Sequence, residues 1–174
     1  SRVVFGPPLP PGFVPLRLRP PVATEVKVEY DDRQTLCWDA TGEGDIRTYD
    51  NNTAKIGHVT KMSGSEVFPY FSKDGSRLLY TRKQRNTEDV FLINADGTGD
   101  TPVSGGGGDQ SRPIFANGKI VFFDSSRGEG IWDIASVASP GGSKTIEARG
   151  VRLPLRARPA ISPDGQWLAF SYDD

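Results

Sequence analysis

Cysteine, histidine and long apolar runs are scarce or missing in this sequence. The single cysteine, Cys37, has no partner for an intrachain disulfide, and its place in the apolar stretch TLCW favours a small buried side chain over a nucleophile. No apolar run approaches the roughly 18 residues of a membrane span, and no charged and then apolar leader follows Ser1. We therefore expect no membrane insertion, and the sequence carries no direct signal for a compartment.

An excess of charge of either sign is also missing. The 174 residues include 21 Lys and Arg against 22 Asp and Glu, for a net charge of −1. Near-neutrality gives no broad attraction to nucleic acid or anionic lipid, and aromatic residues do not alternate with the basic ones as base stacking would need. We therefore expect no nucleic-acid partner. The length suits one ordinary domain.

Sustained helical periodicity is the third absence. No window keeps apolar residues at i, i+3 and i+4 over several turns, and 20 Gly and 14 Pro residues are spread along the chain as turn residues. The sequence therefore predicts an all-β protein with almost no helix.

A repeat organises what is present. Pro69, Pro113 and Pro159 lie 44 and 46 residues apart, and each is followed by an extended stretch, a turn containing glycine and an apolar strand. The Asp-Gly or Asn-Gly pair in each turn supplies the positive φ that a β-hairpin needs. The three copies are FPYFSKDGSRLLYTR (68–82), RPIFANGKIVFFDS (112–125) and RPAISPDGQWLAFSY (158–172).

Each complete unit is expected to hold four short strands. Two more strands follow the hairpin, at 88–97 and 101–104 and again at 129–142 and 144–148, and a looser copy of the unit occupies 20–68. Four-stranded units repeating at about 40 to 50 residues are typical of β-propeller blades. We therefore predict blades of four antiparallel strands, about three full blades and a half blade, at 20–68, 69–112, 113–158 and 159–174.

The turn sequences carry a resemblance to a known family. SPDGQWLAF (162–170), SKDGSRLLY (72–80) and DVFLINADGTG (89–99) resemble the TolB-type propeller repeat, whose WD-like blades have Ser-Pro-Asp-Gly turns. The resemblance implies a periplasmic or extracellular location. It also implies either a partner-binding role, as in TolB, or a lid role like that of propellers attached to some serine peptidases.

The half blade at 159–174 leaves three arrangements open. The chain is a portion of a longer propeller, two copies complete one another, or residues 1–19 return as a closing strand through RVVF (2–5). PPLPPG (7–12) breaks strand pairing and suits a Pro-rich N-terminal arm better. We therefore favour completion by another polypeptide segment, because unpaired strand edges recruit other chains.

Few residues suggest chemistry. His58 is alone and no G-x-S-x-G elbow is present, so we expect no catalytic triad. GGSKT (141–145) lacks the spacing of a phosphate loop and is predicted to be a hairpin turn. Asn94, Asp96 and Asp100 could offer oxygen ligands to calcium, although the EF-hand spacing is missing and such residues are common in turns. No other metal or cofactor is predicted.

Five arginines alternate along two basic stretches. In a strand they would share a face that could bind an anionic partner, and a solvated strand edge is the alternative interpretation. These candidate partner-binding residues are Arg17, Arg19, Arg152, Arg156 and Arg158.

The sequence therefore favours a non-catalytic β-propeller portion that acts as a protein-interaction module or assembly subunit, with a protein partner or a second copy completing the propeller. The alternative is an accessory propeller segment of an enzyme such as a serine peptidase, gating a catalytic domain that this sequence does not contain. A small-ligand site at the mouth of the ring is a third interpretation.

Overall fold

The computed structural model describes residues 29–30, 35–39, 44–50, 52–128, 130–151, 159–162, 164 and 166–170. This part of the chain is built from strands and turns, and it contains no helix that is long or apolar enough to cross a membrane. The all-β prediction is confirmed.

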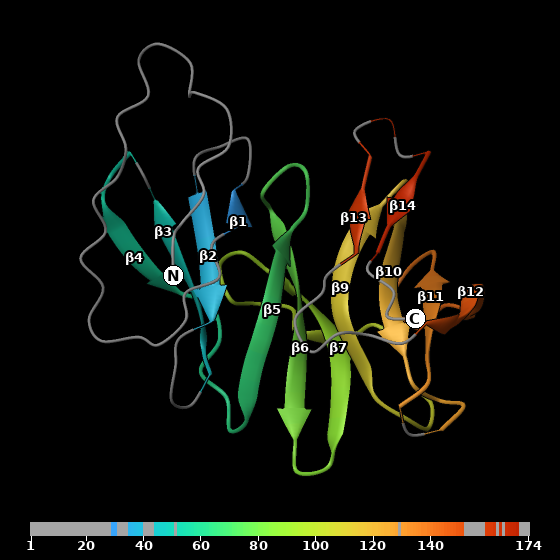
Figure 1. Ribbon diagram of the computed structural model, residues 1–174. Coiled ribbons are helices and arrows are strands. Elements are labelled where there is room, and N and C mark those ends of the chain that lie inside the picture. The colour runs from blue at the N-terminus through green and yellow to red at the C-terminus, as the bar shows by residue number, and fades with distance from the viewer. Residues whose placement is uncertain are drawn as a thin grey trace, which may run out of the picture.

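The strands of the described residues form four antiparallel sheets in which each strand pairs with the next one along the chain. Figure 1 shows the three larger sheets side by side in chain order, with β13 and β14 overlapping β9 and β10 of the third sheet in this view. The first sheet contains β1 (Glu29–Tyr30), β2 (Thr35–Asp39), β3 (Ile46–Asp50) and β4 (Lys55–His58). The second contains β5 (Ser65–Phe71), β6 (Arg77–Gln84), β7 (Thr87–Asn94) and β8 (Thr101–Pro102).

The third sheet contains β9 (Gln110–Ala116), β10 (Lys119–Asp124), β11 (Trp132–Val137) and β12 (Thr145–Val151). The fourth is a two-stranded hairpin of β13 (Ala160–Ile161) and β14 (Leu168–Ala169). Three four-stranded blades followed by a half blade are therefore confirmed. The unit boundaries remain a prediction, and the N-terminal arm lies outside the described residues.

The hairpin turns owe their shape to a local hydrogen-bond pattern. In the second sheet the Ser72 hydroxyl donates to the Asp74 carboxylate at 2.6 Å, and the Arg77 N–H donates to the Ser72 hydroxyl oxygen at 3.0 Å. Hydrogen bonds from Ser72 and Ser76 hold the pKa of Asp74 below its usual range. Bonds of the same kind join Ser162, Asp164 and Trp167 in the last hairpin.

Apolar side chains between the sheets hold the blades together. One cluster joins the first and second sheets through Ile46, Leu78 and Ile93, which are all buried. A second cluster joins the second and third sheets through Leu79 and Phe122. Because each sheet buries one face against each neighbour, a single blade of this kind has no complete core of its own.

Two of the repeated prolines, Pro69 and Pro113, lie inside the first strand of their blades, whereas Pro159 comes directly before β13. The ladder is irregular beside both Pro69 and Pro113, and the residue before each proline has positive φ, 56° at Phe68 and 55° at Arg112. Proline cannot donate to a ladder and is tolerated at a bulge. The Arg112 guanidinium lies 5.1 Å from the centre of the Phe68 ring, so the two bulged residues meet across adjacent blades.

Candidate functional site

The segment between β4 and β5 crosses from the first sheet to the second and is tied back to the start of β3. The Val59 N–H donates to the Ile46 carbonyl at 3.0 Å, and the Ile46 N–H donates to the Thr60 hydroxyl oxygen at 2.8 Å. The Glu66 N–H donates to the Gly44 carbonyl at 2.7 Å. We call this junction of residues 58–66 with the second sheet the first seam.

Glu66 places a carboxyl group inside the first seam. It is 0% exposed, and neither of its carboxylate oxygens has a hydrogen-bond partner among the described residues. The nearest cation is Arg82, whose Nε lies 3.7 Å from Glu66 Oε1. Burial raises the pKa of Glu66 above its usual range, and this effect outweighs the nearby Arg82 charge, which lowers it.

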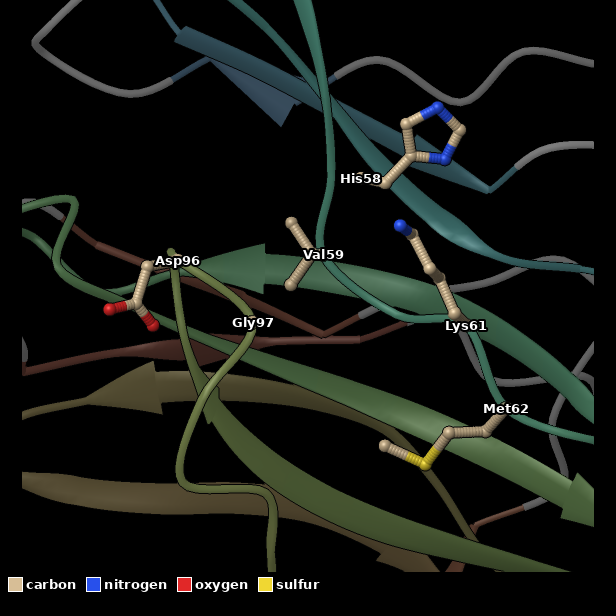
Figure 2. Close-up of a pocket in the computed structure, with 6 residues that line it drawn as sticks. All are labelled: His58, Val59, Lys61, Met62, Asp96 and Gly97. Carbon is tan, nitrogen blue, oxygen red and sulfur yellow. The ribbon is translucent and has the colours of Figure 1, made fainter.

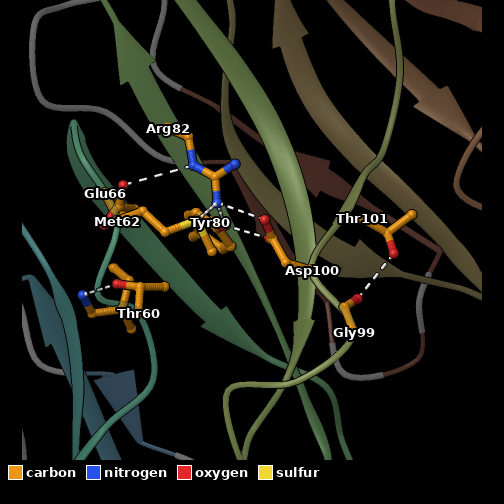
Figure 3. A network of polar contacts seen from close by, with 9 residues as sticks. Thr60, Met62, Glu66, Tyr80, Arg82, Gly99, Asp100 and Thr101 are labelled. Atoms are coloured by element: carbon orange, nitrogen blue, oxygen red, sulfur yellow. Dashed lines mark hydrogen bonds and ion pairs between the residues drawn. The ribbon is translucent and has the colours of Figure 1, made fainter.

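Arg82 is shared among several acceptors (Figure 3). Its Nη2 donates to Asp100 Oδ2 at 2.7 Å, to Met62 Sδ at 2.8 Å and to the Tyr80 hydroxyl. The Tyr80 hydroxyl in turn donates to Asp100 Oδ1 at 2.5 Å, and burial raises the pKa of Tyr80. The guanidinium also lies 4.0 Å from the centre of the Phe91 ring, within cation–π range.

The charges in this network do not balance when every acid is ionised. Asp100 and Glu66 would carry two negative charges against the single positive charge of Arg82, and Asp45 adds a further negative charge nearby. Asp100 has the close contact with Arg82, so Glu66 is the acid whose neutral form burial favours. The first seam therefore holds a buried carboxyl group whose pKa is raised.

An open pocket lies beside this network on the same seam (Figure 2). Its volume is about 330 Å³. Figure 2 shows the Lys61 ammonium and the His58 ring on one side and the Asp96 carboxylate on the other, pointing away from them. The lining residues are His58, Val59, Lys61, Met62, Asp96 and Gly97.

The β13–β14 hairpin presents large apolar side chains to solvent. Trp167 is 75% exposed and Phe170 is 39% exposed. Ile161 and Leu168 are partly buried against the core of the third sheet, so this hairpin is held by one face. In the described part of the chain, β14 pairs with β13 and with no other strand.

The three calcium candidates fall in two separate hydrogen-bond systems. The Asp96 carboxylate accepts from the Thr98 N–H at 2.9 Å and the Thr98 hydroxyl at 2.7 Å, and Asn94 donates to the same hydroxyl at 3.0 Å. Asp100 belongs instead to the Arg82 network. Among the described residues, no group of three or more His, Cys, Asp or Glu side chains is placed to hold a metal ion.

The other sequence candidates have mixed outcomes. Arg17, Arg19, Arg152, Arg156 and Arg158 all lie outside the described residues. Lys144 of the GGSKT segment donates to Asp124 at 2.6 Å and to Ser126 at 3.0 Å, a structural role that suits the predicted hairpin connection.

Sequence reasoning missed the Glu66, Arg82 and Asp100 network. A signal for its position was available, because Glu66 and Gln110 each lie three residues before a repeat proline. Gln110 is also 0% exposed, and it accepts from the Ser104 hydroxyl at 2.5 Å. A polar residue at this position is therefore buried in both blades.

No protein-family profile and no curated protein sequence matches the chain. Solved structures do match in fold. The putative TolB from Agrobacterium tumefaciens aligns with a TM-score of 0.72 at 15% identity over 87% of this chain and 60% of that one. TolB from Acinetobacter baumannii aligns with a TM-score of 0.67 at 18% identity over 81% of this chain and 36% of that one.

A chain from a nidogen–laminin complex aligns with a TM-score of 0.69 at 15% identity, over 84% of this chain and 56% of that one. The chain spans less than two thirds of the length of each of these structures. The chain therefore has the β-propeller fold that the TolB structures share, which confirms the TolB-like resemblance of its repeats at the level of the fold.

Proposed function

We propose that this chain is a non-catalytic β-propeller portion that binds a strand of another polypeptide segment at the open edge of β14. The observation that carries the proposal is the β13–β14 hairpin, whose second strand has an unpaired edge in the described part of the chain and exposed apolar side chains beside it.

The complete sheets indicate what belongs at this edge. In the first three sheets the second strand pairs with a third, as β2 does with β3, β6 with β7 and β10 with β11. β14 is the second strand of its sheet. An edge with free N–H and C=O groups accepts an added strand through main-chain hydrogen bonds. The expected occupant is therefore an extended segment that takes the place of a third strand.

Trp167 and Phe170 support a protein as the source of that segment. Exposed apolar side chains that gather on a surface mark contact sites, and tryptophan is enriched among residues that dominate binding energy. The segment belongs to a second copy, to a different protein or to a further part of a longer propeller that contains this chain. The structural likeness to a chain from a nidogen–laminin complex is consistent with a protein-binding role. As part of this proposal we place the chain outside the cytoplasm, as the TolB resemblance implies.

Light scattering coupled to size exclusion, over a concentration series, tests the proposal. We expect a mass that rises above that of the monomer, and we expect Trp167→Lys to reverse the rise. Ile56→Lys is the matched control, because Ile56 is 57% exposed on the first sheet, away from the hairpin. A monomer at every concentration contradicts pairing between copies, and equal effects of the two variants contradict the β14 edge as the contact.

A second candidate function is an accessory propeller of a hydrolase. The fold likeness to puromycin hydrolase favours it, with a TM-score of 0.56 at 10% identity over 83% of this chain and 24% of that one. In that case a catalytic domain is encoded in the same polypeptide or beside it. Sequencing the gene on both sides of the encoded chain tests this, since a neighbouring hydrolase domain would support the accessory role.

A further inference from the structure

We propose that the pocket on the first seam binds a small molecule that carries one carboxylate on an apolar body. The proposal is independent of strand binding at β14. Lys61 and His58 would hold the carboxylate, and Val59 and Met62 would contact the apolar part.

Comparison of equivalent positions in two repeats distinguishes the residues that the fold requires from those that only line the pocket. A second seam lies 44 residues further on, between the second and third sheets. The residues that support the crossing segment are the same or similar in the second seam. The equivalent pairs are Val59 and Val103, Thr60 and Ser104, and Gly97 and Gly141. Val59 and Val103 are both buried, as are Thr60 and Ser104. These residues are the ones that the crossing itself requires.

The side chains that line the pocket are not kept at the second seam. His58, Lys61, Met62 and Asp96 correspond there to Pro102, Gly105, Gly106 and Pro140. At these positions the second seam has no imidazole or thioether. The ammonium beside it belongs to Lys144, which is paired with Asp124. Met62 Sδ already accepts from Arg82 Nη2 at 2.8 Å, so the groups that the fold does not require are those of His58 and Lys61, and we attribute their convergence to a ligand.

The charges of the pocket select an anion. Lys61 forms no ion pair with any described residue, so its charge is available to a ligand. The acid across the pocket, Asp96, is occupied by its bonds to Thr98 and points away (Figure 2). Asp96 keeps its negative charge, but its carboxylate lies on the far side and points away, so the anion-binding side of the pocket is that of Lys61. The single ammonium on that side suits a single negative charge, and a carboxylate meets it with a charge-assisted hydrogen bond.

Size and polarity define the rest of the ligand. A volume of about 330 Å³ is at the small end of ligand pockets. The Val59 and Met62 side chains line the pocket and offer apolar contact. N-acetyl-leucine therefore represents the class, with N-acetyl-leucinamide as its uncharged counterpart.

The single methionine provides a direct readout of the pocket. With the methionine methyl labelled with carbon-13, the protein shows one such resonance, that of Met62. We expect N-acetyl-leucine to shift this resonance saturably with a dissociation constant in the millimolar range. We expect the amide, and the Lys61→Gln variant with the acid, to bind about tenfold more weakly.

Lys73→Gln is the matched control, because Lys73 is an exposed lysine in the β5–β6 turn, outside the pocket. Its titration should equal that of the unmodified protein. An unchanged Met62 resonance in ligand-free Lys61→Gln would show that the fold is intact. The proposal is overturned if no saturable shift occurs, if acid and amide bind equally, or if Lys61→Gln binds as tightly as Lys73→Gln.

Discussion

Replacing Glu66 with glutamine should stabilise the chain, and the gain should grow as the pH rises. Glu66 is fully buried with no hydrogen bond to either carboxylate oxygen among the described residues, and burial raises its pKa. The folded state therefore keeps the Glu66 proton at pH values where the unfolded chain has lost it. The stability that Glu66 contributes is fully present below the ordinary pKa of 4.5 and is lost as the pH rises through the folded-state pKa.

Glutamine cannot ionise, and the same chain already has a buried glutamine at the equivalent position. At the corresponding position of the next blade, Gln110 is fully buried. Its Oε1 accepts from the Ser104 hydroxyl at 2.5 Å, and its Nε2 has no hydrogen-bond partner among the described residues. Thr60 is the residue equivalent to Ser104, so in the Glu66→Gln variant its hydroxyl is the one expected to donate to the glutamine. Arg82 keeps its bond to Asp100 at 2.7 Å, so the change leaves no unpaired cation.

The size of the effect follows from the cost of an unsatisfied buried polar group, about 1 to 3 kcal/mol. We expect Glu66→Gln to differ little from the unmodified protein near pH 4 and to be more stable by about 1 to 3 kcal/mol at pH 8. Urea unfolding followed by tryptophan fluorescence at several pH values measures this difference.

The reverse change at the equivalent site is the control. Gln110 lies opposite Asp124 on β10, so Gln110→Glu would place a second carboxyl beside a buried one. It should destabilise the protein, and increasingly so at higher pH. A gain from Glu66→Gln that does not change with pH, or a loss at pH 8, would refute the assignment of Glu66 as the proton-binding group.

Two further substitutions test the same seam. Asp100→Asn takes away the close carboxylate partner of Arg82 and should cost about 2 kcal/mol, more at acidic pH where Glu66 is neutral, by the same urea assay. Gly97→Ala should cost about 1 to 3 kcal/mol, because its Cβ would lie 2.7 Å from the Val59 carbonyl oxygen at a φ of 86°. Gly107→Ala, with no atom within 4 Å of its Cβ, should be nearly neutral in the same measurement.

The blade architecture was predictable because its signals are local. Ser72, Asp74 and Gly75 form their turn through contacts within a few residues, so the turn sequence identifies the hairpin wherever it occurs. The spacing of the repeats then gives the number of four-stranded sheets. The sequence predicts a strand start at each proline, which Pro159 fits, whereas Pro69 and Pro113 lie at bulges. The positive φ of Phe68 and Arg112 at these bulges depends on the neighbouring blade as well as on local sequence.

The candidate sites were much less predictable. Glu66, Arg82 and Asp100 meet only after β5, β6 and the β7–β8 connection are arranged in space, and no short motif joins them. The pocket combines residues 58–62 with Asp96 and Gly97 for the same reason. The sequence signal available was the comparison of equivalent positions in two repeats. It identifies the residues that differ between two blades, but not the residues that they contact.

That comparison also identifies Glu66 as the exception in a shared design. In the second sheet Arg82 on β6 pairs with Asp100 at 2.7 Å, and in the third sheet Asp124 on β10 pairs with Lys144 at 2.6 Å. Asp100 and Lys144 are equivalent, because they lie 44 residues apart. Arg82 lies opposite Glu66, and Asp124 lies opposite the equivalent residue Gln110. The two ion pairs therefore occupy the same place in their blades, with the positive and negative partners exchanged.

An ion pair between the second strand and the last connection is thus common to both blades, whichever partner carries the positive charge. In the third sheet the remaining position is the neutral Gln110, and the charges balance. In the second sheet the same position is Glu66, which adds a carboxyl that the pair does not need. Because the fold is built with a neutral residue at this position one blade further on, the ionisation of Glu66 is a property of the first seam rather than a requirement of the propeller.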